Sequence, residues 1–217
     1  MSYQRTAFSE IKHLLPPDAW AAWRNDLHKG EFEAESVLVF ENSTELEELN
    51  LDAPFDEVEH VFLILVKGNL TIQRFVYNED TDGATGLIVL GDLQAATMLV
   101  GGQEIYITGN LLVSELFWGD YNHGDLRVLG NATAGVFVET DQYSVSIAQR
   151  VTIGTHLTPY REDGNWRGLD ADLARKLLVD ELVNVEDDEI VLVRDEAILS
   201  RLQAGQSLLK SRPTQLD

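Results

Sequence analysis

Apolar and polar residues alternate on both sides of a recurring Gly-Asn or Gly-Asp step between residues 60 and 160. The steps are Gly68-Asn69, Gly91-Asp92, Gly109-Asn110 and Gly130-Asn131, with Gln149-Arg150 as a degenerate fifth copy. Two and four residues before and after the first residue of each step, every position is aliphatic. A period of two indicates short strands with one buried face, and Gly with Asn or Asp suits a sharp corner between them.

A third apolar cluster follows each step by about seven residues. These clusters are Phe75-Val76, Met98-Leu99-Val100, Leu116-Phe117-Trp118, Val136-Phe137-Val138 and, weakly, Leu157. Three short strands in a unit of about twenty residues are typical of a β-solenoid, in which each coil buries its inner face against the next. The pattern therefore predicts a mainly β protein with a solenoid of about five coils.

The spacing of the copies favours a right-handed solenoid. A left-handed helix of hexapeptides needs an aliphatic residue at every sixth position, and here Gly101 and Gly119 interrupt that series. The copies are also 23, 18, 21 and 19 residues apart, and such variable loops suit a right-handed β-helix better.

The flanking segments follow other patterns. Residues 17–30 predict an amphipathic helix, with Trp20 and Trp23 on one face and Gly30 at its end. Residues 37–40 are expected to form a strand of an incomplete first coil. The predicted regions are an N-terminal helix with an acidic capping segment (1–60), the solenoid core (61–158), and an α-helical C-terminal cap and tail (159–217).

The C-terminal region repeats leucines at helical spacing over residues 170–183, and residues 190–193 are expected to be extended. Asp195 is placed to begin a second helix, which Gly205 closes. A solenoid has two open ends, so both flanks are expected to provide α-helical caps. Residues 165–205 have a second interpretation, as a separate docking element.

Composition adds a strong negative charge. The 217 residues include 16 Lys and Arg against 37 Asp and Glu, which gives a net charge of −21. Such a chain repels nucleic acid and anionic membranes and attracts a basic protein partner. There is no cysteine, and neither a transmembrane run nor a secretory signal is visible. We expect a cytoplasmic bacterial protein, without nucleic-acid or membrane partners.

The coil pattern resembles that of bactofilins, bacterial cytoskeletal proteins that polymerise and are built as right-handed β-helices. It is still more similar to a group of uncharacterised bacterial proteins that share that label. The segments that carry the resemblance are residues 86–102, 104–110 and 121–131. The resemblance implies a self-assembling scaffold. Variable coil lengths, folded flanks and the more negative charge depart from that family.

Motifs for chemistry are missing. The five histidines show no metal-binding spacing, and no phosphate-binding glycine loop or nucleophile elbow occurs. Among the acids, Glu115, Asp120 and Asp125 are candidates for polysaccharide cleavage, but we interpret them as solvated loop carboxylates. The sequence therefore predicts no enzyme, no catalytic residue, no metal ligand and no cofactor.

Two segments are candidates for binding a partner. Residues 118–124 gather Trp118, Asp120, Tyr121, Asn122 and His123 in one loop, and aromatic residues on loops are favoured anchors. The other interpretation is a structural turn, with Asn122 and Gly124 in left-handed conformations. The acidic stretch before the solenoid adds Glu45, Glu47 and Glu48, which suit attraction of a basic surface.

Two functions remain. The first is a non-catalytic acidic protein-binding module, most concretely an immunity protein that neutralises a basic bacterial toxin domain. The alternative is a bactofilin-like self-assembling cytoskeletal scaffold. The charge and the folded flanks favour a monomer or small oligomer over a filament.

Overall fold

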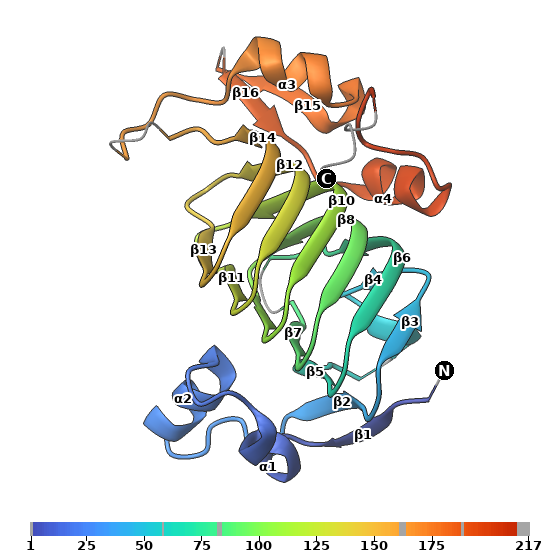
Figure 1. Cartoon of the computed structure of the whole chain (residues 1–217), viewed down its shortest axis with the longest axis vertical. Coiled ribbons are helices and arrows are strands. Elements are labelled where there is room, and N and C mark those ends of the chain that lie inside the picture. The colour runs from blue at the N-terminus through green and yellow to red at the C-terminus, as the bar shows by residue number, and fades with distance from the viewer. Residues whose placement is uncertain (1, 58, 82–83, 161–163, 188, 212–217) are drawn as a thin grey trace.

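The computed structural model describes residues 2–57, 59–81, 84–160, 164–187 and 189–211, and it is a parallel β-solenoid (Figure 1). Two seven-stranded sheets form its long faces. The first sheet contains, in spatial order, β1 (Gln4–Ala7), β2 (Ser36–Phe40), β5 (Leu63–Val66), β7 (Gly86–Val89), β9 (Glu104–Ile107), β11 (Asp125–Val128) and β13 (Ser144–Ile147). The second contains β3 (Thr44–Leu46), β4 (Leu49–Asn50), β6 (Leu70–Tyr77), β8 (Leu93–Gly101), β10 (Leu111–Asp120), β12 (Ala132–Glu139) and β14 (Val151–Leu157).

The predicted right-handed coil is confirmed. In Figure 1 the second sheet lies in front and its strands rise, while the stack advances from the lower right to the upper left. From β5 to β13 the chain completes four turns, and the last coil stays incomplete because the chain leaves the solenoid after β14. The predicted first strand is β2, which pairs with β5 in parallel register.

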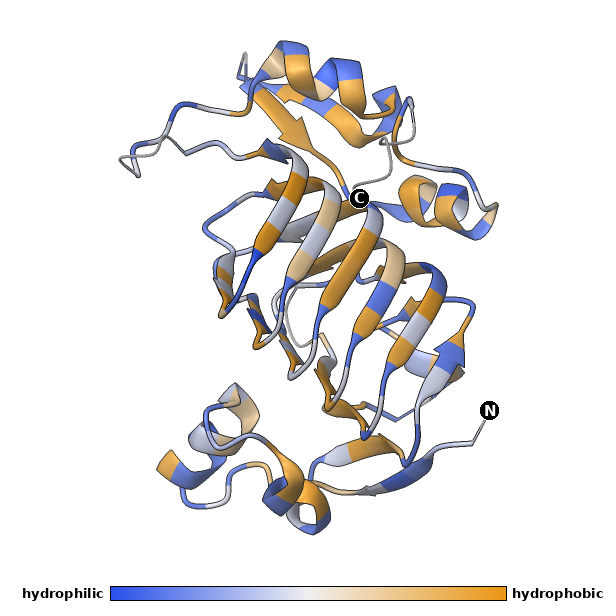
Figure 2. Cartoon of the chain, in the orientation of Figure 1, coloured by the Kyte–Doolittle hydropathy of each residue, from blue (hydrophilic) through white to orange (hydrophobic). Residues whose placement is uncertain are grey.

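The predicted inward positions form the core between the two sheets. In the first four copies all of them are buried, and in the fifth Val145, Ile147 and Ile153 are only partly buried. Parallel register stacks like positions, as with Leu70, Leu93 and Leu111. Figure 2 shows the resulting stripes of hydrophobic and polar residues along the front strands.

The third apolar cluster is not a separate strand, which corrects the expected three strands per coil. It is the second half of a long strand, β6, β8, β10 or β12, after a register shift such as the one between Val113 and Leu116. A bulge bends a strand and interrupts its ladder of hydrogen bonds only locally, and here the pairing resumes at Leu116. The bend turns Phe117 toward the main core, while Leu116 and Trp118 pack on the other side.

The Gly-Asn steps form a ladder of side-chain hydrogen bonds along one corner. Asn69 Oδ1 accepts from the backbone N–H of Asp92 at 2.9 Å, and Asp92 Oδ1 accepts from that of Asn110 at 2.7 Å. The same contact continues through Asn131 to Arg150. The glycines are required by space, since a Cβ at Gly109 would lie 2.6 Å from the backbone of Gly91.

The N-terminal segment packs against the outer face of the first sheet. It contains β1, α1 (Phe8–Ile11), a 3-10 turn at Lys12–Leu14 and α2 (Trp20–Leu27). Phe8, Ile11 and Phe32 pack with outward residues of β2, β5, β7 and β9. The predicted helix is present, but its buried residues are Ala21 and Asn25, whereas Trp20 and Trp23 are 36% and 45% exposed.

The C-terminal segment contains α3 (Ala171–Leu177), a 3-10 turn at Asp180–Leu182, the hairpin β15 (Val183–Glu186) and β16 (Glu189–Leu192), and α4 (Glu196–Gln203). Asp170 and Asp195 cap the two helices, and Asp195 does so where the sequence predicted. The segment packs along the outer side of the long strands, against residues such as Tyr77, Leu116 and Trp118. The N-terminal and C-terminal helices therefore cover the outer sides of the two sheets (Figure 1).

The two ends of the solenoid differ. At the N-terminal end, β1 pairs antiparallel with β2, and the rings of Tyr3, Phe40 and Phe55 lie 5.1–5.6 Å apart over the core. Another 3-10 turn, Pro54–Asp56, carries Phe55. At the other end, β13 and β14 are the last strands of their sheets, and Val151 is 46% exposed. Among the described residues, no helix has the length and apolar character needed to cross a membrane.

Candidate functional site

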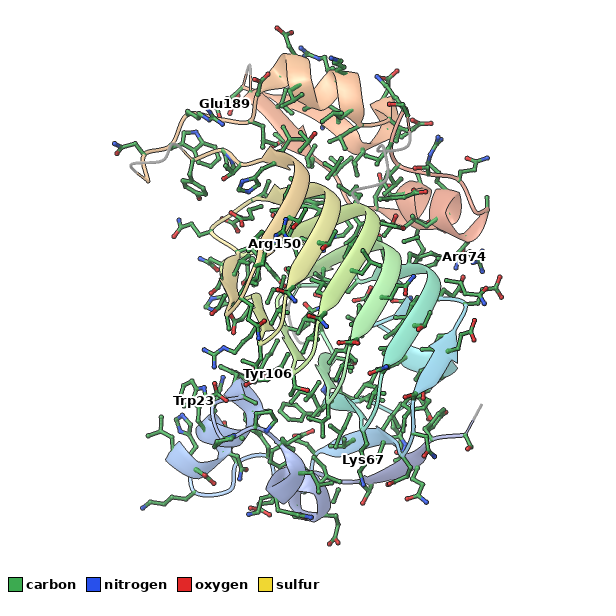
Figure 3. All side chains as sticks on the ribbon, in the orientation of Figure 1. Trp23, Lys67, Arg74, Tyr106, Arg150 and Glu189 are labelled. Atoms are coloured by element: carbon green, nitrogen blue, oxygen red, sulfur yellow. The ribbon has the colours of Figure 1, made fainter. Side chains whose placement is uncertain are left out.

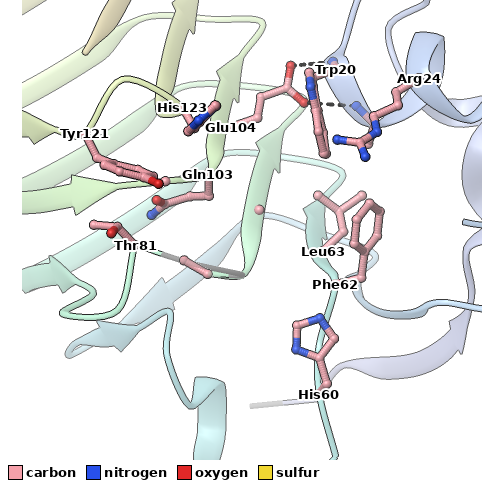
Figure 4. A pocket seen from close by; sticks show the side chains of 14 residues that line it. Trp20, Arg24, His60, Phe62, Leu63, Thr81, Gln103, Glu104, Tyr121 and His123 are labelled. Atoms are coloured by element: carbon pink, nitrogen blue, oxygen red, sulfur yellow. Dashed lines mark hydrogen bonds between the residues drawn. The ribbon is translucent and has the colours of Figure 1, made fainter. Parts of the chain in front are cut away.

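A pocket of about 450 Å³ opens between α2 and the first sheet (Figure 4). Its polar lining includes Arg24, Gln103, Glu104, Tyr121 and His123. Its apolar lining includes Trp20, Phe62 and Leu63. The pocket thus brings together the start of α2, the start of β9 and the loop before β11, which are far apart in the sequence.

One strand position in the wall of the pocket, Gly86, lacks a side chain. Leu63 pairs with Gly86 and Glu104 pairs with Asp125 on neighbouring strands, and a Cβ on Gly86 would lie 3.7 Å from the carbonyl oxygen of Glu104. A Cβ on Gly86 would approach Leu63 Cδ1 at 3.2 Å, a contact that a flexible side chain can relieve. Gly86 therefore leaves a hollow between the apolar wall at Leu63 and the carboxylate of Glu104.

Glu104 is a buried acid at the N-terminal end of α2. Its residue is only 7% exposed, and its Oε1 accepts a hydrogen bond from the Trp20 backbone N–H at 2.7 Å. Its Oε2 accepts a longer one, 3.5 Å, from the N–H of Ala21. Burial raises the pKa of Glu104 to about 7, although the two backbone hydrogen bonds oppose the rise. This carboxyl therefore titrates near neutral pH.

Gln103 lies beside Glu104 and has an unused acceptor. The residue is 5% exposed, and its Nε2 donates to Asn78 Oδ1 at 2.8 Å. Its Oε1 has no hydrogen-bond partner among the described residues. A buried polar atom without a partner costs free energy, and this oxygen is enclosed by the protein, so it does not face the pocket.

An aromatic ring and a cation line the α2 side of the pocket. The Arg24 guanidinium lies 4.7 Å from the centre of the Trp20 ring, and its Nε is 3.5 Å from Glu31 Oε2. In the view of Figure 4 the Trp20 ring stands between Arg24 and Glu104. Arg24 is thus partly neutralised by Glu31, and it stabilises the ring by a cation–π contact.

Three of the predicted site residues lie in the loop that borders this pocket. Tyr121 and His123 are lining residues with ring centres 5.3 Å apart, and both Asn122 and His123 are exposed. The left-handed residue of the turn is Tyr121, with φ of 79°, and not Asn122 or Gly124. The space beside Gly124 is filled by the ring of Tyr143, which a Cβ would approach at 2.3 Å.

Trp118 and Asp120 belong to a different environment. Trp118 is 1% exposed and lies between the solenoid and the C-terminal segment, where its Nε1 donates to Thr140 Oγ1 at 2.6 Å. The guanidinium of Arg194 lies 5.3 Å from the ring centre and 3.4 Å from Asp120 Oδ2. The structure thus places Trp118 in a core, which leaves no surface for a partner to contact.

The predicted acids Glu45, Glu47 and Glu48 lie in the first coil, near α4. Arg74 Nη2 contacts Glu48 Oε2 at 2.6 Å and Glu47 Oε1 at 3.1 Å, and its Nη1 donates to the carbonyl of Gln203 (Figure 3). Glu45 accepts a hydrogen bond from Gln73. These acids therefore have partners within the chain, and they do not line the pocket with Tyr121 and His123.

The sequence did not single out Gln103 or Glu104. In the alternating pattern Glu104 is an ordinary outward-facing acid, and only α2 encloses it. Within the described ranges, no three His, Asp or Glu residues are grouped closely enough to hold a metal ion. The site has the acceptors and aromatic surfaces of a binding pocket.

Comparison with known proteins gave no relative: no family model, curated protein or solved structure matches the chain.

Proposed function

We propose that this chain is a non-catalytic acidic protein-binding module, most concretely an immunity protein that neutralises a basic toxin domain. The observation that carries the proposal is the net charge of −21. Ion pairs within the chain already engage many of the basic residues: Arg5, Lys12, Arg24, Lys67, Arg74, Arg127, Arg194, Arg201 and Lys210. The charge that remains to face a partner is therefore negative, which accelerates association with basic surfaces.

The surface around the pocket, called the pocket side below, supports the proposal because it offers a contact surface. There Asn122 and His123 are exposed on a loop, and loops held by a rigid scaffold are common places for recognition. The open face of the second sheet is a poorer choice. In the middle of that sheet the outward positions Thr71, Gln94 and Thr133 carry no charge to attract a basic partner.

The first prediction tests where the partner binds. Asn122→Lys places a positive charge on the pocket side, and Gln94→Lys places the same charge on the open sheet face. The probe is a panel of purified bacterial toxin domains with a pI above about 9, measured by biolayer interferometry at about 150 mM salt. We expect a binder with Kd below about 1 µM. Asn122→Lys should weaken it about tenfold, and Gln94→Lys much less.

Two results oppose this proposal. If no basic domain binds in that affinity range, the function is wrong. If the two lysine variants weaken binding equally, only the net charge matters and the pocket side is not the contact surface.

A second candidate function is self-assembly, and the open C-terminal end of the solenoid favours it. The inward ladders continue to Val145, Ile147 and Ile153, and among the described residues no strand covers them. The opposite end is occupied by β1 and by the rings of Tyr3 and Phe55. A second copy stacked on the open end would form a closed dimer, because the covered ends cannot extend it.

Light scattering checks this second candidate. We expect the wild-type chain to show a mass twice that of one chain, and Ile153→Lys to show the mass of a monomer. Leu112→Lys is the matched control, since Leu112 is 39% exposed on the face of the same sheet and away from its edge. A wild-type monomer at high concentration, or filaments, would each contradict the closed dimer.

A further inference from the structure

The floor of the pocket is formed by Glu104, whose carboxylate has hydrogen-bond acceptor positions left for a ligand that carries donors. A carboxylate has about four acceptor positions, and the backbone N–H groups of Trp20 and Ala21 occupy two of those on Glu104. Gln103 also lines the pocket, but its Oε1 is enclosed and is not open to a ligand. A ligand that uses the remaining positions on Glu104 must present N–H donors, and a planar fork with two of them fits one carboxylate.

The charge around the floor favours a cation. Asp125 is the register partner of Glu104 on β11, and the pKa of Glu104 reflects a repulsive contribution from it. The nearby Arg127 binds Asp18 at 2.8 Å, and Arg24 lies 3.5 Å from Glu31, so both cations are paired. The charges around the pocket therefore favour a positively charged ligand, and the molecule as a whole is strongly acidic.

The walls suit a side chain with an aliphatic stem and a planar head. Phe62 and Leu63 provide an apolar wall, and Trp20, which is 36% exposed, provides a ring. A guanidinium stacks on aromatic rings and presents five donors in a fixed fork, whereas an ammonium is a compact and strongly hydrated charge. Arg24 already stacks on one side of the Trp20 ring, and the other side of the ring is turned toward Glu104 (Figure 4).

We propose that this pocket receives an arginine side chain of the basic partner, whose guanidinium donates to Glu104 and packs against Trp20. The inference rests on the proposed protein-binding function for the source of the arginine. The hollow itself depends on Gly86, where any larger side chain fills the space between Leu63 and Glu104.

The test uses a small probe, N-acetyl-L-arginine amide, titrated into the full-length protein and followed by amide NMR. We expect saturable shifts of the backbone N–H groups of Trp20 and Ala21 and of the Gln103 side-chain amide, with Kd on the order of 1 mM. N-acetyl-L-citrulline amide has the same shape without the charge and should bind at least about tenfold more weakly.

Two variants test the charged floor and the empty space of the pocket separately. Glu104→Gln removes the charge, and Gly86→Ile fills the space while it leaves every polar group in place. Each should weaken the probe about tenfold or more. Glu45→Gln, an acid on the other sheet, should leave the affinity unchanged. Thermal melts of each variant establish that the fold is retained.

The possible outcomes are distinct. The arginine pocket is wrong if the probe causes no saturable shifts, if the citrulline probe binds equally, or if both pocket variants bind like wild type. Should the arginine probe bind as expected while no basic domain does, the pocket stands and the protein-binding function fails. If a basic domain binds and Gly86→Ile does not weaken that binding, the protein-binding function stands and the arginine pocket is wrong.

Discussion

Trp118→Ala is expected to destabilise the protein by about 3–5 kcal/mol, the usual cost of removing a buried large aromatic side chain. Trp118 is 1% exposed, and it packs with residues of both the solenoid and the C-terminal segment. The change also removes the hydrogen bond to Thr140 and the ring under the Arg194 guanidinium. Since the side chain of Arg194 is 5% exposed, its charge would lose a favourable contact that it cannot regain from water.

Denaturant unfolding measures this loss, and limited proteolysis locates it. We expect the C-terminal segment to become sensitive to protease before the solenoid, because the lost contacts join the two. Trp166→Ala is the control: Trp166 is 56% exposed, so its change should cost less than about 1 kcal/mol. A stable Trp118→Ala protein that fails to bind a partner would support the surface role predicted from the sequence.

The sequence predicted the solenoid because the pattern of inward residues is local and repeats. Each coil needs the same alternation beside its corner, and positions such as Leu70, Leu93 and Leu111 therefore recur. The Asn ladder recurs for the same reason, since each Asn or Asp side chain binds the backbone of the next coil.

The sequence was misleading where burial depends on a distant segment. Its position at the start of an unusual loop predicts that Trp118 is an exposed anchor. The three consecutive apolar residues Leu116, Phe117 and Trp118 in fact mark a strand buried on both faces. Recognising that signal would have placed a second layer beside the solenoid.

The pocket lay beyond sequence reasoning for a related reason. Trp20 and Glu104 are 84 residues apart, and only the docking of α2 turns an outward acid into a buried one. Asp18 helps to fix that docking, since its carboxylate accepts from Tyr106 Oη at 2.9 Å and from Arg127 at 2.8 Å. The loop with Tyr121 and His123 stands out in the sequence by its composition, whereas nothing in the sequence marks Glu104, which lines the same pocket.

Glu104→Gln is expected to change how stability depends on pH. The pKa of Glu104 rises from about 4.5 when the chain is unfolded to about 7 when it is folded, chiefly through burial. Between these values the folded state binds more protons than the unfolded state, so this group lowers the free energy of unfolding as pH rises. The loss amounts to about 3 kcal/mol and is complete above pH 7. Glutamine does not titrate, and its variant should lack this loss.

The decisive quantity is the difference in unfolding free energy between Glu104→Gln and wild type, measured by denaturant titration at intervals from pH 4.5 to pH 8. The difference should shift in favour of the variant by about 3 kcal/mol across that range. Gln retains one acceptor for the helix, so any hydrogen bond lost to Ala21 moves the whole curve without changing its slope. Acids whose pKa is lowered, such as Glu57, contribute equally to both proteins and cancel.

Glu45→Gln, which replaces an exposed acid, is the control and should give a flat difference over the same pH range. A flat difference for Glu104→Gln as well would mean that the carboxyl is not buried beside α2, and the pocket would lose its charged floor.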